Sequence, residues 1–208
     1  MDDNDRAKIE LRQNGPLVVK GLTSMVGEDG AELEAKPVMA LCRCGQSRTK
    51  PFCDGSHKEA GFLSENLTPA AGRDRLIAYQ GAEVTITYNP LLCSHTAECG
   101  RLARHIFNPD QKPWIQPDNG TRDEVSSAVA ACPSGALALI GPEHLVPERA
   151  EIKVEKNGPY WVTGPSVAAP SPGEGACTDK FVLCRCGHSG NKPYCDGSHR
   201  DKGWKSQS

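Results

Sequence analysis

The chain has 208 residues, of which 24 are Lys or Arg and 26 are Asp or Glu, so its formal net charge is −2 at pH 7. This balance gives no field strong enough to gather nucleic acid, and no run of 18 apolar residues is present to cross a membrane. With only 38% hydrophobic and 5% aromatic residues the cores are thin, so we expect the ten cysteines to stabilise the fold.

The amino-terminal stretch MDDNDRAKIE is acidic and lacks the apolar segment of a signal peptide. We therefore expect a bacterial protein of the cytoplasm with no membrane attachment. Because disulfides are rare in a reducing compartment, grouped Cys and His residues indicate metal binding.

The first region, 1–62, is expected to consist mainly of β-strands. Apolar and charged residues alternate over 7–12, which predicts a half-buried strand. Asn-Gly-Pro at 14–16 predicts a turn before a short apolar strand over 17–19. A third strand, over 38–41, leads directly into a group of cysteines.

That group has the sequence CRCGQSRTKPFCDGSH. Cys42 and Cys44 are two positions apart, so on an extended segment their thiolates point the same way. Cys53 and His57 are four apart, which places both on one face of a predicted helix over 54–60. Two pairs of ligands suit a two-iron cluster, with one pair for each iron. Spacing alone leaves open a single zinc ion held by three Cys and one His.

The second region, 63–148, is expected to be a small inserted domain. A hairpin is predicted over 75–88, turning at Gln80-Gly81, and a helix over 97–106. The segments LCSHTAECG and AACPSGAL follow the hairpin. In these features the region resembles ferredoxin-like α+β domains of the divergent single-cluster type.

In such ferredoxins a C-x2-C-x2-C run supplies three cluster ligands and a distant Cys-Pro supplies the fourth. Cys93, Cys99 and Cys132 match three of these positions, whereas Thr96 stands at the middle one. The resemblance implies a third cluster, either [3Fe–4S] on three thiolates or [4Fe–4S] with a substitute ligand such as His95. A degenerate domain without a cluster is the alternative.

The third region, 149–208, repeats the first. RAEIKVEKNGPYWVTG aligns with RAKIELRQNGPLVVKG, and CRCGHSGNKPYCDGSH aligns with the first cysteine group. Residues 165–176 are rich in Pro, Gly, Ser and Ala, and we expect a flexible connection there. Cys177 has no counterpart in the first region and is interpreted as a free thiol without an assigned role.

Both cysteine groups match C-x-C-x2-S-x3-P-x-C-D-G-S-H, and in this they resemble the CDGSH iron–sulfur family, which includes mitoNEET. The resemblance implies two [2Fe–2S] clusters, each held by three Cys and one His. The implied ligands are Cys42, Cys44, Cys53, His57, Cys184, Cys186, Cys195 and His199. Of the neighbouring cations, Arg43, Arg185, Lys50 and Lys192 are expected to face solvent.

Single-motif members of this family are typically homodimers built on shared strands. Because this chain contains two such units, we expect a monomer of mostly β, α+β class. Its two units would form an internal pseudo-symmetric β-sandwich with short cluster-binding loops and helices. Two independent units, each dimerising with another molecule, are the alternative.

These features predict an iron–sulfur protein that acts in electron transfer with a redox partner of unknown identity. One alternative is storage of [2Fe–2S] clusters and their transfer to an apo-protein acceptor; a second is a zinc-stapled interaction module. No nucleophile–base pair or Gly-rich phosphate loop is present, so we expect no enzymatic activity, and we expect neither nucleic acid nor membrane as a partner.

Overall fold

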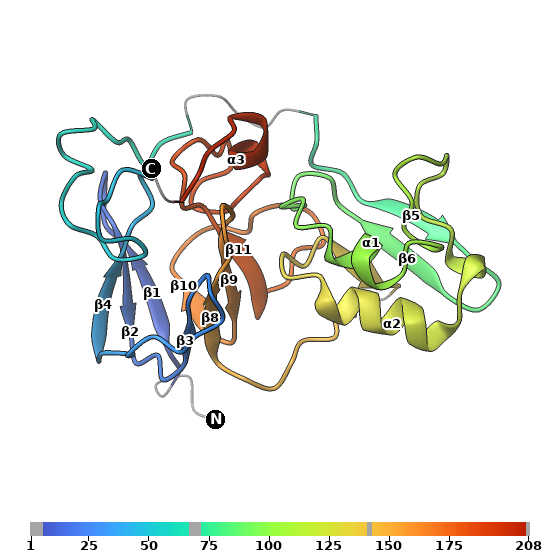
Figure 1. The fold of residues 1–208 in the computed structure, drawn as a ribbon. Coiled ribbons are helices and arrows are strands. Elements are labelled where there is room, and N and C mark those ends of the chain that lie inside the picture. Colours follow the sequence, from blue (N-terminus) through green and yellow to red (C-terminus); the bar gives the residue numbers. More distant parts are fainter. Residues whose placement is uncertain (1–5, 67–71, 141–142, 207–208) are drawn as a thin grey trace.

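The computed structural model describes residues 6–66, 72–140 and 143–206, and it is mostly β-structure arranged in three small sheets (Figure 1). Residues 1–5, the first half of the acidic amino-terminal stretch, lie outside the described part. Within that part, no helix combines the length and apolar character needed to cross a bilayer.

The first sheet has the strand order β10-β1-β2-β4 and the second has the order β11-β9-β8-β3. The strands contributed by the first region are β1 (Lys8–Leu11), β2 (Leu17–Lys20), β3 (Met25–Val26) and β4 (Val38–Leu41). Those from the third region are β8 (Glu151–Val154), β9 (Tyr160–Thr163), β10 (Ser166–Val167) and β11 (Lys180–Leu183). The three strands predicted for the first region are confirmed.

The predicted Asn-Gly-Pro turns are also present in both repeats. Asn14 and Asn157 have positive φ angles of 50° and 56°, a conformation that Asn tolerates better than most residues. The Gly15 N–H donates to the Arg12 carbonyl at 3.0 Å, which closes the turn between β1 and β2. Each turn therefore reverses the chain so that two strands pair antiparallel.

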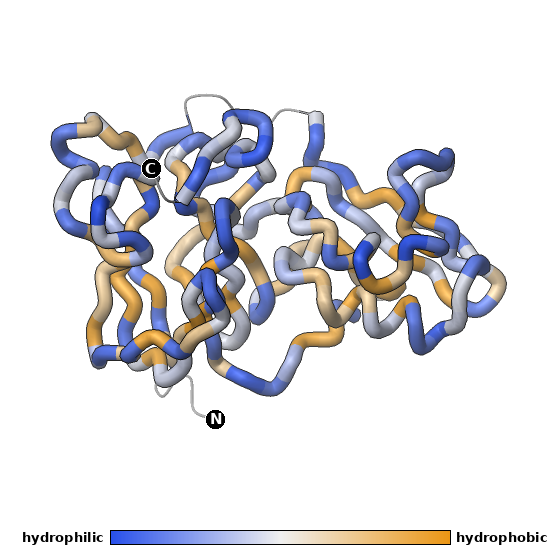
Figure 2. Tube along the Cα trace, viewed as in Figure 1, coloured by the Kyte–Doolittle hydropathy of each residue, from blue (hydrophilic) through white to orange (hydrophobic). Residues whose placement is uncertain are grey.

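The two repeats exchange short strands. Lys8 of β1 pairs with Ser166 of β10, and Met25 of β3 pairs with Ile152 of β8; both pairings are parallel. One buried hydrophobic cluster contains side chains from both repeats, and Figure 2 shows hydrophobic residues along the strands of both sheets. The segment 165–176, predicted to be only a flexible connection, thus includes a strand, because its partner lies in the distant β1.

The insert has a sheet of β5 (Ile77–Gln80), β6 (Thr85–Tyr88) and β7 (Leu137–Leu139), with a separate buried core. The predicted hairpin is confirmed, but it turns over residues 81–84 and not at Gln80-Gly81, because Gln80 still pairs with Thr85. The helices are α1 (Glu98–Leu102), the 3-10 helix η1 (Pro117–Asn119) and α2 (Arg122–Ala131). A capping box between Thr121 and Glu124 begins α2.

Two helix predictions need correction. Residues 54–60 form turns, and in the third region only α3 (Ser198–Asp201) is helical. Gly55 and Gly197 stand two positions after the third cysteine and have φ angles of 94° and 88°, so a right-handed helix cannot begin before the serine that follows each of them. The helix predicted over 97–106 is shorter because Ala103 leaves the helical conformation.

Candidate metal centres

The first CDGSH loop brings its four predicted ligands together as two pairs. The Sγ atoms of Cys42 and Cys44 are 3.6 Å apart, and Cys53 Sγ is 3.4 Å from His57 Nδ1. The Cys53 N–H donates to the Ala40 carbonyl in β4, so the loop folds back onto the strand that leads into it.

The second loop repeats this geometry. Cys184 Sγ lies 3.7 Å from Cys186 Sγ, and Cys195 Sγ lies 3.4 Å from His199 Nδ1. Within the described residues, no three side chains of the metal-binding kind gather around a single ion position. The structure therefore presents pairs of donors.

One thiol of each C-x-C pair has a low pKa. The hydrogen bond with Cys44 and, to a smaller extent, backbone N–H groups lower the pKa of Cys42 to about 5. The corresponding hydrogen bond with Cys186 lowers the pKa of Cys184 to about 6. Because a thiolate is the form that binds metal, Cys42 and Cys184 are ready ligands at neutral pH.

The arginines between the paired cysteines do not face solvent as predicted. Arg43 and Arg185 are each only 3% exposed. Arg43 Nε donates to the Gly15 carbonyl at 2.7 Å, and Arg185 Nη1 donates to the Glu155 carbonyl at 2.7 Å. They point away from the cysteines, but toward the Asn-Gly-Pro turns, whose carbonyl groups need donors. Arg185 also pairs with Glu28 of the other repeat at 2.6 Å.

The serine and aspartate of the motif shape each loop. Ser47 Oγ donates to the Phe52 carbonyl, and Ser189 Oγ donates to the Tyr194 carbonyl, both at 2.6 Å. Asp54 accepts hydrogen bonds from the backbone N–H groups of Arg48 and Ser56. Asp196 does the same in the second loop.

Tyr160 connects the second repeat to the first loop, a role that the sequence analysis missed. Its hydroxyl has one proton to donate, which lies between two carbonyl oxygens, those of Cys42 at 2.7 Å and Pro51 at 2.9 Å. The aligned residue of the first repeat is Leu17. This difference between otherwise similar repeats was the only feature of the sequence analysis that pointed to a special role for Tyr160.

The two loops also meet each other directly. Cys44 and Cys186 form an isolated antiparallel bridge. Gly45 and Gly187 have positive φ, and a Cβ at Gly45 would lie 2.8 Å from the Cys186 carbonyl oxygen. A Cβ at Gly187 would lie 2.9 Å from the Cys44 carbonyl oxygen. Glycine at both positions therefore permits the close approach of the loops.

The three predicted thiols of the insert line one small cavity of about 30 Å³, together with His95 and Thr96. Burial, and then the nearby Cys132 and Cys93, raise the pKa of Cys99 to about 12. The His95 Nδ1 atom lies 3.8 Å from Cys93 Sγ. The structure thus brings together all the residues that were predicted for a third site.

The second loop contacts the insert. A Cβ at Gly197 would lie 2.4 Å from His95 Cδ2 and 3.3 Å from the Cys93 carbonyl oxygen. Arg73 donates to the Asp196 carbonyl at 2.6 Å. By these contacts the second CDGSH loop lies between the first loop and the thiols of the insert.

Lys180 joins the second sheet to the insert. It is 2% exposed, and its Nζ donates to the carbonyls of Val129, Ala130 and His144 at 3.0, 3.2 and 2.6 Å. Two of these carbonyls belong to the last turn of α2, directly before Cys132. Lys180 therefore helps to fix the position of Cys132. Nearby Cys177 is a buried free thiol.

Comparisons with known proteins show which families the two loops and the insert match. Residues 14–58 and 157–200 match the family described as "Iron-binding zinc finger CDGSH type". Residues 79–142 match the family described as "Divergent 4Fe-4S mono-cluster". Two curated relatives, each called "Uncharacterized protein YjdI", come from Escherichia coli K12 and O157:H7; each is 37% identical over 59 residues, which cover 28% of this chain and 78% of the relative.

Paired Cys and His donors on family-matched loops define an iron–sulfur protein. The chain belongs to the CDGSH iron–sulfur family, in a tandem form with a divergent mono-cluster segment inserted between its two motifs. The donor set fits such a cluster, since each loop holds a pair of thiols next to a thiol–imidazole pair.

Proposed function

We propose that this protein carries electrons through two [2Fe–2S] clusters, each bound by one CDGSH loop. The observation that supports this most directly is the pairing of donors in both loops, Cys with Cys and Cys with His. When bound, such a cluster takes up and releases one electron. One neutral imidazole in place of a thiolate favours a potential above the roughly −400 mV of all-cysteine sites.

The chain's own residues would bind the clusters, orient them and limit the access of water. Thiolates of Cys42 and Cys184 supply negative charge, while His57 and His199 present Nδ1 to the same sites. Protonation of that nitrogen would compete with metal binding, so these histidines link electron transfer to pH.

The three sites would form a series. The bridge between Cys44 and Cys186 joins the two loops, and the contact of Gly197 with His95 joins the second loop to the insert. A third cluster on Cys93, Cys99 and Cys132, with His95 as a further ligand, would make the second CDGSH site the central one. Electrons would then pass within one chain before reaching a partner.

The proposed assembly is a monomer with an internal pseudo-two-fold axis and a β-sandwich formed by the two repeats. The exchange of β3 and β10 between sheets and the shared hydrophobic core support this arrangement. We propose no enzymatic activity and a redox protein as partner.

Transfer of clusters to apo-proteins is a second candidate, favoured by one observation. Cys53 of the first loop is partly exposed, whereas its counterpart Cys195 is buried. A cluster in the first loop is thus more accessible to an acceptor's thiols. A zinc-stapled interaction module, with the same Cys and His ligands, is the third candidate.

Metal analysis of anaerobically purified protein tests the proposal. We expect about four irons and four sulfides in the two CDGSH loops, and additional iron when the insert is loaded. Stoichiometric zinc in a colourless protein would overturn the iron–sulfur assignment of these loops. Electron transfer to an oxidised carrier should be faster than cluster transfer to an apo-ferredoxin; the opposite order would favour the second candidate.

A further inference from the structure

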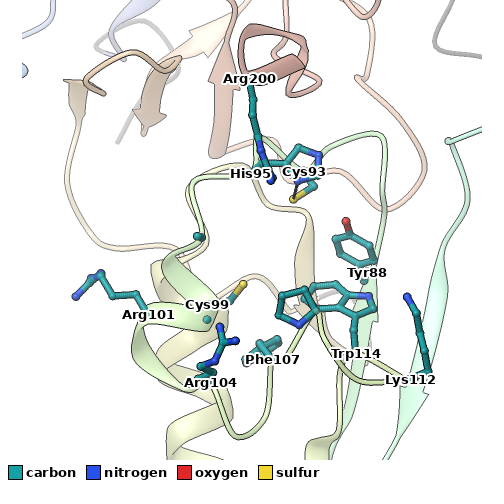
Figure 3. Close-up of a pocket in the computed structure, with 13 residues that line it drawn as sticks. Tyr88, Cys93, His95, Cys99, Arg101, Arg104, Phe107, Lys112, Trp114 and Arg200 are labelled. Carbon is teal, nitrogen blue, oxygen red and sulfur yellow. Dashed lines mark hydrogen bonds between the residues drawn. The ribbon is translucent and has the colours of Figure 1, made fainter. Parts of the chain in front are cut away.

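A hollow of about 570 Å³ opens beside the insert's thiols, at the junction with the second CDGSH unit (Figure 3). Most of its walls belong to the insert, whereas Arg200 comes from α3, directly after the predicted ligand His199. Junctions between structural units and volumes of this size are typical of small-molecule sites.

The hollow is separate from the small cavity between the three thiols. Cys132 lines only the small cavity, whereas Cys93 and Cys99 line both. A molecule in the hollow would therefore lie next to two of the three thiols, on the side away from Cys132.

Aromatic side chains form the floor of the hollow. Trp114 lies edge-on to Tyr88, with ring centroids 4.9 Å apart, and its centroid is 6.3 Å from that of Phe107. Trp114 is partly exposed, although its neighbours are buried. A fixed and accessible aromatic surface of this kind suits a flat ring.

The rim carries positive charge. It includes Arg101, Arg104, Lys112 and Arg200, and none of the described residues that line the hollow is Asp or Glu. Arg101 and Arg104 each pair with a carboxylate outside the lining. Within the described part of the chain, Lys112 and Arg200 have no carboxylate partner. These two cations are therefore available to an anionic ligand.

We propose that the hollow binds a small anion with a flat aromatic body, of the class of phosphate-bearing aromatic redox cofactors. The ring would lie on Trp114, and the phosphate would contact Lys112 and Arg200. The redox assignment of the ligand rests on the proposed electron-carrying function, because the hollow adjoins Cys93 and Cys99. The aromatic and anionic character of the ligand rests on the lining alone.

Equilibrium dialysis of the full, iron-loaded chain with flavin mononucleotide and riboflavin tests this proposal. The two probes share one ring system and differ only in the phosphate. We expect flavin mononucleotide to bind more tightly, and Lys112→Gln and Arg200→Gln each to weaken its binding about threefold. Neither substitution should change the binding of riboflavin. Trp114→Leu should weaken the binding of both probes.

Lys36→Gln is the matched control, since Lys36 is an exposed lysine of the first repeat. Equal affinity for the two probes, or binding that does not respond to Lys112→Gln and Arg200→Gln, would overturn the proposal. Absence of flavin binding would overturn it too. That result would be expected if the hollow were the docking site of an acidic protein. Dialysis measures binding without electron transfer, so its outcome is separate from that of the metal analysis.

Discussion

The two CDGSH loops contain the same ligands in the same geometry, but their surroundings differ. In the first loop Cys53 is partly exposed and Asp54 is exposed, whereas Cys195 and Asp196 of the second are 3% and 4% exposed. The second loop packs against the insert, and the first has no such cover in the described structure. A repeated motif thus fixes the donors, while contacts from elsewhere in the chain decide how accessible each site is.

Breaking the junction between the second unit and the insert should have the largest effect. Lys180→Met leaves two buried carbonyls and one partly buried carbonyl without their common donor, which we expect to cost about 2–4 kcal/mol of unfolding free energy. Denaturant unfolding measures this change. The control is Lys20→Met, at a partly exposed ion pair with Glu10, which should change stability by under about 1 kcal/mol. Equal effects of the two substitutions would show that Lys180 does not stabilise the junction.

The motif glycines offer a matched test of the same comparison. Gly55 and Gly197 both have positive φ, so alanine should cost about 1–2 kcal/mol at either position. Only at Gly197 would the added Cβ meet another part of the chain, the ring of His95; at Gly55 nothing lies within 4 Å. We therefore expect Gly197→Ala to be more destabilising than Gly55→Ala by a further 1–2 kcal/mol or so.

Thermal unfolding of the two alanine variants, together with the reactivity of Cys93 toward a thiol reagent, checks this prediction. Cys93 should become more reactive in Gly197→Ala alone. Identical unfolding and identical reactivity in the two variants would mean that the second loop does not pack on the insert in solution.

Tyr160 belongs to the second repeat, yet Tyr160→Phe should reduce the stability of the first loop. The substitution removes the hydroxyl that donates to the Cys42 and Pro51 carbonyls, and we expect a cost of about 1 kcal/mol. Loss of colour from the first site should also become faster. A variant with wild-type stability and wild-type cluster lifetime would contradict this role for Tyr160.

The smallest expected difference between the two sites is in the pH at which each loses its cluster. Burial, and then the charge of His95, lower the pKa of His199 below its ordinary value of about 6.5. Its imidazole therefore stays neutral, and able to bind metal, to a lower pH than a free imidazole would. The first loop is also the more exposed to water, because Cys53 is partly exposed and Cys195 is 3% exposed. As pH falls, we therefore expect the first site to bleach before the second.

Absorbance followed against pH in His57→Cys and His199→Cys checks the order. Because thiolate replaces the labile imidazole, His57→Cys should remove the early phase of bleaching and His199→Cys the late one. A single phase that neither substitution changes would show that these histidines are not the acid-labile ligands.

The sequence was a good guide to local structure. Period-two alternation located the strands around the turns at Asn14 and Asn157, and spacing located the donor pairs, because both depend on neighbours in the chain. The internal repeat predicted that the two units pack together, but the sequence did not show which residues make contacts between distant segments. The burial of Arg43, the strand at Ser166–Val167 and the buried lysine at 180 all depend on partners far away in sequence. The helix predicted over 54–60 was wrong: the left-handed glycine of the motif keeps residues 54 and 55 out of a right-handed helix, and residues 56–60 form turns.

The exchange of β3 and β10 has a consequence for synthesis of the chain. The edge of β1 remains uncovered until Ser166 and Val167 have been translated. At roughly 5–20 residues per second, that delay lasts on the order of ten seconds or more. During this time the first half presents an unpaired strand edge next to a set of free thiols, a combination prone to association with other chains. We therefore expect a nascent chain that ends before residue 165 to need protection by a chaperone, even though its first motif is already complete.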